Sequence, residues 1–364
     1  MKAKATHRGK RKKVFSAIGA IGEILLTLAA LCILYAIWQI GWTGVVSQRT
    51  QTQEFDTVSW QTPGSGGDGY KIASPASGAP PVLPNLQTPG AILGEIYIPC
   101  FGSQYKRLIV QGTSLVQLDR HGLGHYQSTP MFGAVGNVAL AGHREGYGAP
   151  LGDVSKFQAG DEIIIRTTRY WYVYDYQSYQ IVDPSQTSVI DPVPNQPGAI
   201  PTERLMTLTT CTPRYGIPTH RWIVYAQFKY WAYVKDGIPA ALAQEGSGGK
   251  ITFPAAFNSW TANIPPVSSI FYFLLAAWLV VFVAAAITWR WPSMRKNEKG
   301  MRSKPYSIYS ALRWINPGVK AIRWILLILA ILWFIALLFT WVFPWMAATI
   351  PILKSSSNYV AIPQ

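Results

Sequence analysis

The stretch EIIIRTTRYWYVYDYQ, residues 162–177, decides the fold of the central part of the chain. Isoleucines fill the run from Glu162 to Arg166, and every second residue from Tyr170 to Tyr176 is a tyrosine. Because side chains alternate between the two faces of a strand, these tyrosines share one face. β-Branched and aromatic residues favour strands, so we predict a β-strand in each run.

Similar short runs recur through residues 91–230, where Gly, Pro and Asp separate segments rich in Val, Ile, Tyr and Thr. The other candidate strands are Gly94–Ile98, Arg107–Gln111, Asn137–Ala141, Tyr179–Asp183, Leu205–Thr210 and Trp222–Gln227. About eight strands in this length fit a closed barrel, which leaves no exposed edge. We therefore predict a mainly β fold, with a β-barrel over residues 91–230 and little helix within it.

Charge is distributed unevenly along the 364 residues, of which 49% are hydrophobic and only 13% charged. Residues 1–13 hold seven basic residues and no acidic one, and residues 290–323 hold nine basic residues and one acidic. Residues 43–267 balance fifteen basic with fifteen acidic residues, so the formal net charge of +15 arises outside them. A nucleic-acid-binding domain needs positive charge on the folded domain itself, and the neutral middle region argues against that class.

Three uncharged stretches, residues 24–46, 268–289 and 324–346, are long enough to cross a bilayer core of about 30 Å as helices. We predict three transmembrane helices rather than buried core helices. Basic segments that flank spans stay in the cytoplasm. Residues 1–23 and the loop 290–323 are therefore predicted to be cytoplasmic, and residues 43–267 and the tail 347–364 to be extracellular.

A cleaved signal peptide is the rival interpretation of the first span. The span is longer than the apolar core of about 7–15 residues that such peptides carry, and no small-x-small cleavage site is clear. Residues 47–90 contain mostly Gln, Thr, Gly, Ser and Pro, so we predict a flexible stalk there. Its glycines Gly64, Gly66 and Gly69 match G-x-G-x-x-G without the strand and helix that such a loop needs. Residues 231–267 are predicted to be a linker.

Two of the three cysteines, Cys100 and Cys211, lie in the predicted extracellular region, and Cys32 lies in the first span. Extracellular cysteines are usually paired, so a disulfide between the two is one interpretation. The surroundings of Cys211 favour a thiol instead. It ends the run LMTLTTC, and Arg221 begins the next strand, RWIVYAQ. Antiparallel pairing at a spacing of about 4.8 Å returns this guanidinium to the thiol, where a cation favours the thiolate.

A histidine is needed as well, because arginine does not release its proton near neutral pH and a departing amine requires an acid. His143, in NVALAGHREGYG directly after a predicted strand, is the first candidate. His121 and His125, in DRHGLGHY, are assigned to a Gly-rich loop as turn or surface residues, and His220 is either a neighbour of the site or a plain loop residue. No acidic partner stands at an obvious spacing. Cysteine and histidine together indicate acyl transfer through a thioester.

At this point the residues resemble a known family. TLTTC, residues 207–211, matches the sortase signature TLxTC, with Arg221 in the following strand and His143 in the preceding GHR. The phrases GTSLVQLDRHGLGHY and GNVALAGHREGYGAPL are most similar to the class E sortases of actinobacteria. The resemblance covers about residues 91–229.

The resemblance implies an eight-stranded sortase-like barrel and a cysteine transpeptidase. Such enzymes cleave a cell-wall sorting signal between Thr and Gly and pass the acyl group to an amine of a peptidoglycan precursor or of a pilin lysine. It implies Cys211 as the nucleophile, His143 as the acid and then the base, and Arg221 as the group that holds substrate and stabilises the oxyanion. Thr210 and His220, which flank these residues, are candidate substrate-binding residues.

The expected partners are proteins that carry a sorting signal, a lipid-linked wall precursor or pilin lysine as acceptor, and the membrane. No cofactor and no metal site are expected. The expected signal resembles Leu-Ala-X-Thr-Gly more than Leu-Pro-X-Thr-Gly, and the basic loop 290–323 is expected to hold anionic lipid headgroups. Two alternatives remain: a pilin-polymerising sortase, and a non-catalytic anchored binding module in which Cys100 and Cys211 are bonded.

Overall fold

The computed structural model describes residues 17–67, 69–253, 264–289, 291 and 307–356. The chain divides into two compact units. The first consists of residues 1–36 and 265–345, and the second of residues 37–264 and 346–364. Each unit is described by itself below.

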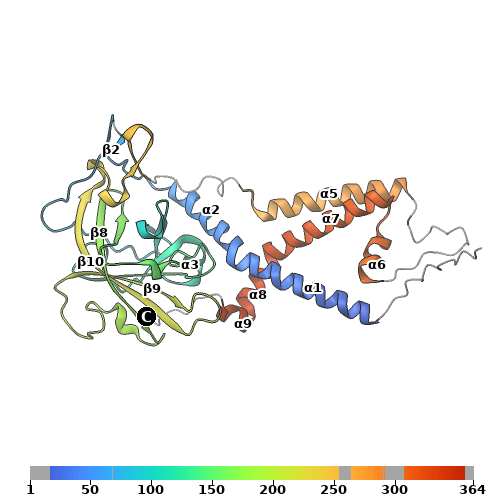
Figure 1. The fold of residues 1–364 in the computed structure, drawn as a ribbon, viewed down its shortest axis with the longest axis horizontal. Helices are drawn as coiled ribbons and strands as arrows, with labels where there is room; N and C mark the ends of the chain where they lie inside the picture. Colours follow the sequence, from blue (N-terminus) through green and yellow to red (C-terminus); the bar gives the residue numbers. More distant parts are fainter. Residues whose placement is uncertain (1–16, 68, 254–263, 290, 292–306, 357–364) are drawn as a thin grey trace, which may run out of the picture. The chain divides into compact units, whose positions relative to one another are not determined.

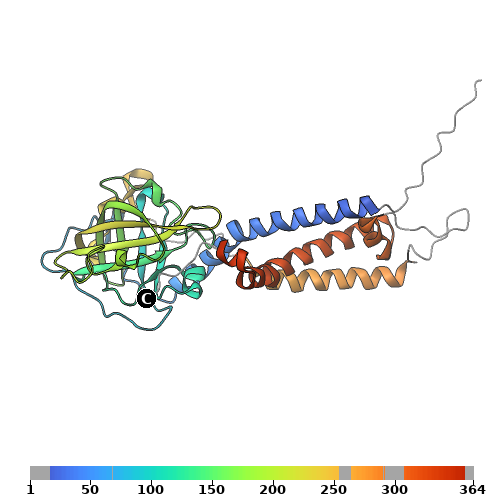
Figure 2. The ribbon, with the colours of Figure 1, turned by 90° about the horizontal axis from the view of Figure 1, so that it is seen from below.

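The first unit is helical. Its helices α5 (Val267–Thr288) and α7 (Lys320–Leu337) lie side by side in Figures 1 and 2. The ring of Phe271 lies 5.6 Å from that of Trp333 and 4.8 Å from that of Trp341, centroid to centroid. A π-helical segment (Leu338–Val342) and the start of α8 (Phe343–Thr349) follow α7 in this unit, whereas the end of α8 and α9 (Pro351–Ser356) belong to the second unit.

Within the described ranges, three helical segments are long and apolar enough to cross a membrane, and each overlaps a predicted span: Ala17–Phe55, Val267–Thr288 and Lys320–Thr349. The first consists of α1 (Ala17–Ile37), a π-helical segment (Trp38–Trp42) and α2 (Thr43–Phe55). The sequence placed residues 43–46 in the first span. In the structure they begin α2, which packs against the second unit's barrel.

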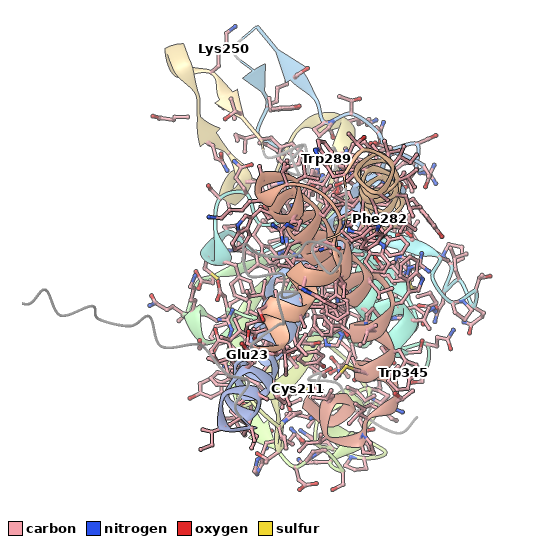
Figure 3. The ribbon with its side chains drawn as sticks, turned by 90° about the vertical axis from the view of Figure 1, so that its right-hand side faces the viewer. Glu23, Cys211, Lys250, Phe282, Trp289 and Trp345 are labelled. Carbon is pink, nitrogen blue, oxygen red and sulfur yellow. The ribbon has the colours of Figure 1, made fainter. Side chains whose placement is uncertain are left out.

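The short helix α6 (Ile308–Ile315) is held to α1 by a carboxylate. Glu23, labelled in Figure 3, accepts hydrogen bonds from the backbone N–H of Ile308 at 2.7 Å and of Tyr309 at 3.3 Å. Ser307 and Ser310 complete the N-terminus of α6 as a capping box. An acidic group at a helix N-terminus offsets the unsatisfied N–H groups there, so Glu23 fixes α6 against the start of the first candidate span.

The second unit contains the predicted closed β-barrel, with strand order β10-β8-β7-β3-β4-β5-β6-β9. Figure 1 shows β8 and β10, which pair antiparallel over their whole length. The β4–β5 and β6–β9 pairs are parallel and the others antiparallel. The strands are β3 (Ile92–Tyr97), β4 (Arg107–Gln111), β5 (Gly122–His125), β6 (Gly136–Gly142), β7 (Glu162–Arg166), β8 (Tyr170–Val182), β9 (Arg204–Thr212) and β10 (His220–Tyr233).

The predicted alternation in β8 is confirmed by its packing. Tyr172 and Tyr174 are buried in the main hydrophobic cluster, and Tyr170 and Tyr176 pack against that cluster from its edge. Trp171 and Val173 point the other way into a second cluster, which includes Tyr97 and Ile164. The wall of the barrel is therefore buried on both sides along this part of β8.

Two expectations about the barrel were wrong in detail. The two runs Tyr170–Tyr176 and Tyr179–Asp183 form the single strand β8, whose register against β10 shifts at bulges. The phrase DRHGLGHY is no loop, because it ends helix α3 (Leu115–His121) and forms β5. Gly124 packs so closely that an added Cβ would lie 2.2 Å from the carbonyl oxygen of Gly112. Glycine at this position therefore allows β5 to pack against the backbone of Gly112. A strand with several glycines is easily mistaken for a loop when only the sequence is known.

Residues 47–90 do not form the flexible stalk expected from their composition. The segment begins in helix α2, and the chain beyond it crosses the barrel surface through specific hydrogen bonds. The N–H of Ala76 donates to Trp231 O at 2.8 Å, the Trp231 indole to Gly78 O at 3.2 Å, and the Tyr172 hydroxyl to Pro81 O at 2.6 Å. Two aromatic side chains of the barrel thus donate to carbonyl groups of this proline-rich segment.

The predicted linker 231–267 also contributes to the folded unit, as far as Phe253. Ile238, Leu242 and Phe253 are buried in the second cluster, outside β8. A small sheet joins this segment to the expected stalk: β1 (Ser65–Gly66), β2 (Gly69–Tyr70), β12 (Ile251–Thr252) and β11 (Gln244–Glu245). Gly66 and Gly69 pair with each other in its hairpin, whereas the sequence predicted a flexible linker there.

Candidate active site

Three neighbouring strands bring the sequence candidates together. In the parallel β6–β9 pair, Ala141 lies opposite Thr209. His143 stands two residues after Ala141, just past the end of β6, and Cys211 stands two residues after Thr209 on β9. In the antiparallel β9–β10 pair, Cys211 lies opposite Arg221. Because adjacent strands are about 4.8 Å apart, the imidazole, thiol and guanidinium all arise at one end of this three-strand group.

Cys211, labelled in Figure 3, is nearly enclosed, with 4% of its surface exposed. None of the described cysteines is in a disulfide. The alternative in which Cys100 and Cys211 are bonded is therefore wrong for this structure. Burial, and next the negative charge of Asp161, raise the pKa of the Cys100 thiol to about 12, so Cys100 is a poor nucleophile at neutral pH.

Thr210 joins the two strands that carry the thiol and the imidazole. Its hydroxyl donates to the carbonyl of Gly142 at 2.7 Å. Thr210 directly precedes Cys211, and Gly142 directly precedes His143. Thr210 is 3% exposed, so its side chain is used for this link within the barrel. His220 is exposed, and its Nδ1 lies 2.9 Å from the hydroxyl of Thr219.

His143 is held by two residues that the sequence analysis did not single out. Its Nε2 lies 2.7 Å from Oδ1 of Asp119, which belongs to α3. Its ring stacks on that of Tyr147, with centroids 4.8 Å apart and planes at 27°. The acidic partner stands in the phrase that also contains His121 and His125, and the misassignment of that phrase to a loop concealed it.

A second guanidinium approaches Cys211. Arg144 donates to the carbonyl oxygen of Cys211 at 3.4 Å and lies over the ring of Trp222, 4.6 Å from its centroid. Burial lowers the pKa of Arg144, the charge of Arg214 lowers it further, and the thiolate form of Cys211 raises it. Arg221 is 3% exposed. Arg144 therefore contacts the backbone of Cys211, and Arg221 stands opposite it in the sheet. Positive charge at these positions favours negative charge that forms at this end of the barrel.

Comparison with known proteins agrees with this arrangement. Residues 96–229 match the family described as Sortase domain. This range contains β6, β9 and all of β10 except its last residues. Residues 96–229 therefore form a sortase domain.

The relatives that the chain matches include class E sortases from actinobacteria, as the sequence resemblance predicted. Sortase SrtE1 of Streptomyces coelicolor is 31% identical over 238 residues, which cover 61% of this chain but only 60% of SrtE1. Sortase SrtE2 of the same organism is 28% identical over 236 residues, which cover 60% of this chain and 86% of SrtE2. The solved SrtA sortase from Actinomyces oris is 39% identical with a TM-score of 0.44, covering 46% of this chain and 96% of that chain.

The two other histidines of the sortase domain are buried, against the expectation of turn or surface residues. His121 is 8% exposed and pairs with the carboxylate of Glu54. His125 is fully buried, with Nδ1 2.7 Å from the side-chain oxygen of Gln111 and Nε2 3.2 Å from Pro130 O. Burial lowers the pKa of His125 to about 4, so its ring is neutral at physiological pH. Both rings stabilise the fold.

The described residues contain no group of three or more His, Cys, Asp or Glu side chains arranged to hold a metal ion. The chemistry available at this end of the barrel is that of a thiol, an imidazole and guanidinium groups. These groups suit nucleophilic attack on a carbonyl and stabilisation of the oxyanion that results.

Proposed function

We propose that this chain is a membrane-anchored cysteine transpeptidase that cleaves a sorting signal between Thr and Gly and transfers the protein to an amine. The observation that supports this most directly is the placement of His143, Cys211 and Arg221 on three adjacent strands of a sortase domain. The Cys211 thiolate attacks the threonine carbonyl and forms a C–S bond. As the C–N bond to glycine breaks, the His143 imidazolium gives its proton to the departing amine.

The second half of the reaction reverses these roles. His143, now neutral, takes a proton from the incoming amine, which attacks the thioester carbonyl and releases the Cys211 thiolate. In both halves Arg221 holds the carbonyl oxygen as it becomes negative, and the nearby Arg144 adds positive charge. We keep His220, which is exposed at this end, as a substrate-binding residue, and Thr210 as a residue that shapes the site from within.

The substrate class and acceptor are also proposals. The signal is Leu-Ala-X-Thr-Gly-like or Leu-Pro-X-Thr-Gly-like, and the acceptor is the amine of a peptidoglycan precursor. Three candidate membrane spans support an anchored enzyme whose domain faces outward, with residues 1–23 and 290–323 in the cytoplasm. Since sorting substrates and lipid-linked precursors are themselves held in the membrane, tethering raises the effective concentration of the reactants.

One assay tests both substrate and acceptor. The full-length protein in detergent is offered peptides that differ only in Ala or Pro at the second signal position, with a glycine-type amine, a peptidoglycan stem peptide or a pilin-type lysine peptide, and products are identified by mass. Transfer of the peptide cleaved after Thr to the stem-peptide amine supports the proposal. Transfer only to the lysine peptide supports pilin polymerisation instead, and the absence of any cleavage with all six pairs would contradict transpeptidation.

A further inference from the structure

Helix α2 packs against the barrel with a polar face. Thr43, Ser47 and Gln51, spaced four residues apart on one side of the helix, are 5%, 0% and 1% exposed. Gln51 accepts a hydrogen bond from the N–H of Leu108 at 3.0 Å and donates to the hydroxyl of Ser47 at 3.2 Å. Buried polar groups persist where they are hydrogen-bonded, so this face is specific to its place on the barrel.

The N-terminal end of α2 holds the loop that follows His143. The Thr43 hydroxyl donates to Gln39 O at 2.6 Å and accepts from the N–H of Tyr147 at 2.8 Å. Gly44 lies so near that a Cβ there would be 3.2 Å from the nitrogen of Gly148. Tyr147 is the residue whose ring stacks on the imidazole of His143.

This loop needs external support because of its backbone. Four successive residues have positive φ angles: Gly146 at 63°, Tyr147 at 48°, Gly148 at 80° and Ala149 at 40°. The left-handed region is unfavourable for residues with a Cβ, so Tyr147 and Ala149 are strained there. Strain of this kind persists only where surrounding contacts enforce it, and the Thr43 hydroxyl is one such contact.

The same helix also holds the other support of His143. α2 packs along α3, where Ser47 donates to Arg120 O at 3.3 Å and Glu54 pairs with His121. Asp119, the neighbour of these two residues on α3, is the carboxylate 2.7 Å from His143 Nε2. One helix therefore contacts both the residue that stacks on the imidazole and the helix that supplies its carboxylate.

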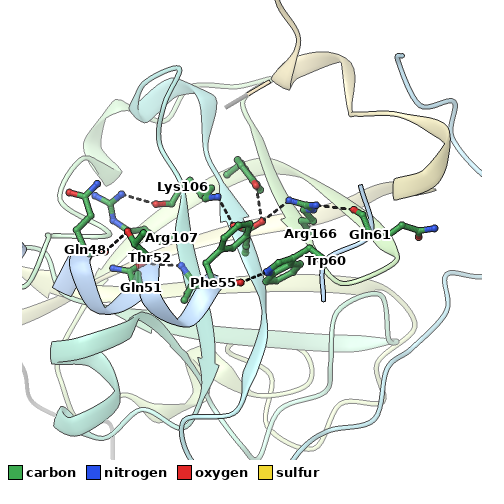
Figure 4. Close-up of polar contacts among 12 residues, drawn as sticks. Gln48, Gln51, Thr52, Phe55, Trp60, Gln61, Lys106, Arg107 and Arg166 are labelled. Atoms are coloured by element: carbon green, nitrogen blue, oxygen red, sulfur yellow. Dashed lines mark hydrogen bonds and ion pairs between the residues drawn. The ribbon is translucent and has the colours of Figure 1, made fainter. Parts of the chain in front are cut away.

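The C-terminal end of α2 is fixed as well, as Figure 4 shows. The Phe55 ring lies beneath the ammonium of Lys106 at 3.9 Å, and Phe55 O accepts from the Trp60 indole at 2.9 Å. The guanidinium of Arg166 donates to Gln61 O at 2.9 Å. α2 lies outside residues 96–229, which match the family, so this support is added to the sortase domain by the C-terminal part of the first candidate span.

We propose that α2 is a positioning element of the active site, in which Thr43, through Tyr147, and Asp119, through α3, set the orientation of the His143 imidazole. The proposal rests on the proposed function for its catalytic consequence. The positioning residues do not touch the substrate. Their loss changes where the imidazole points and leaves the nucleophile and the substrate-binding surface in place.

The test compares Thr43→Val with Thr43→Ser and Thr50→Val in the full-length protein. Thr50 lies on the same helix, but its hydroxyl bonds only to Val46 O within that helix, which makes it a matched control. Thr43→Val is expected to lower kcat for signal-peptide cleavage by about tenfold or more with KM unchanged, because small misplacements of catalytic groups cost up to about 100-fold in rate. Thr43→Ser is expected to restore the rate, and Thr50→Val to leave it unchanged.

A second measurement does not depend on the identity of the substrate. The rate of Cys211 alkylation by iodoacetamide, followed by mass on the Cys211 peptide, reports the imidazole beside the thiol. Thr43→Val and Asp119→Ala are each expected to change this rate severalfold in the otherwise native protein and not at all in a His143→Ala background. Equal effects in both backgrounds, or no difference between Thr43→Val and Thr50→Val, would overturn the proposal. If no peptide is cleaved by the native protein, the proposed function fails while the alkylation result still decides the positioning.

Discussion

Two buried charged clusters of the barrel differ in the balance of their charges. Around Glu95, which is fully buried, the ammonium of Lys106 lies at 2.9 Å and the guanidinium of Arg166 at 3.2 Å, and the Tyr97 hydroxyl donates to the same carboxylate at 2.8 Å. Around Cys211, the guanidinium of Arg144 donates to the backbone carbonyl oxygen and Arg221 lies opposite on β10, whereas the thiol carries charge only once it loses its proton.

The difference separates a structural role from a chemical one. A charged group that meets its permanent partner inside the protein is already satisfied and has nothing further to bind. Cations gathered around a group that is neutral until it reacts favour the charged state formed during the reaction. Four predictions test this distinction, ordered by the size of the expected effect.

The largest effect is expected for the thiol itself. Cys211→Ala removes the nucleophile and little volume, so it should abolish both peptide cleavage and the trapped acyl-enzyme while the thermal midpoint stays close to that of the native protein. Cys100→Ala is the matched control, since that thiol is held protonated at neutral pH, and it should retain cleavage. Acyl-enzyme seen by mass in Cys211→Ala would remove Cys211 from the mechanism.

The next effect is on stability and belongs to the cluster around Glu95. Glu95→Gln leaves two buried cations without their anion and should lower the free energy of unfolding by about 3–5 kcal/mol. Burial already lowers the pKa of Lys106, and the carboxylate of Glu95 opposes that shift. Denaturant unfolding measures the loss.

The control for this variant is Glu162→Gln, which disturbs the more exposed pair with Lys229. Exposed ion pairs contribute about 0–1 kcal/mol, so this change should be small. Similar losses for the two variants would show that burial and balance do not distinguish the Glu95 cluster.

The third effect is on catalysis and belongs to the cluster around Cys211. Arg221→Lys keeps the positive charge but loses the planar fork of donors, so kcat/KM should fall by about 100-fold, as when one oxyanion donor is removed. Steady-state cleavage by the purified full-length variant gives the value. Full activity in Arg221→Lys would mean that charge alone suffices and that the donor geometry of β10 plays no part.

The smallest effect compares two histidines. His143 has a carboxylate beside it, whereas His125 is buried among Gln111, Thr129 and Pro130. The folded protein lowers the pKa of His125 to about 4, below the value of about 6.5 in an unfolded chain. Between these values the unfolded chain binds the proton more readily, so stability is present above the upper value and falls as the pH is lowered, by up to about 1.4 kcal/mol per pH unit.

This slope has a direct check. In His125→Gln the free energy of unfolding should fall less steeply between pH 6.5 and 4 than in the native protein, even if the variant is less stable throughout. Parallel curves for the two proteins would contradict a buried, neutral His125.

Local patterns were sufficient where the relevant residues lie close together in the chain. Alternating tyrosines predicted the face of β8, and the apolar run before Cys211 predicted β9, because a period of two and a high β-propensity need no knowledge of distant partners. Strand β5 was not predicted because it is rich in glycine, which has low β-propensity. Gly124 is needed because the backbone of Gly112 approaches it closely, and the residues next to Gly124 in the chain do not reveal that contact.

The sequence by itself determined a mainly β domain, three apolar segments able to span a membrane, and a Cys, His and Arg set in the order of a sortase. Only the tertiary structure decided that Asp119 meets His143, that Arg144 reaches Cys211, and that residues 43–90 fold onto the barrel. The reason is physical. Periodicity and motifs are properties of neighbouring residues. A carboxylate 24 positions away, or a proline-rich segment held by aromatic donors, gains its role from contacts that exist only after the chain has folded.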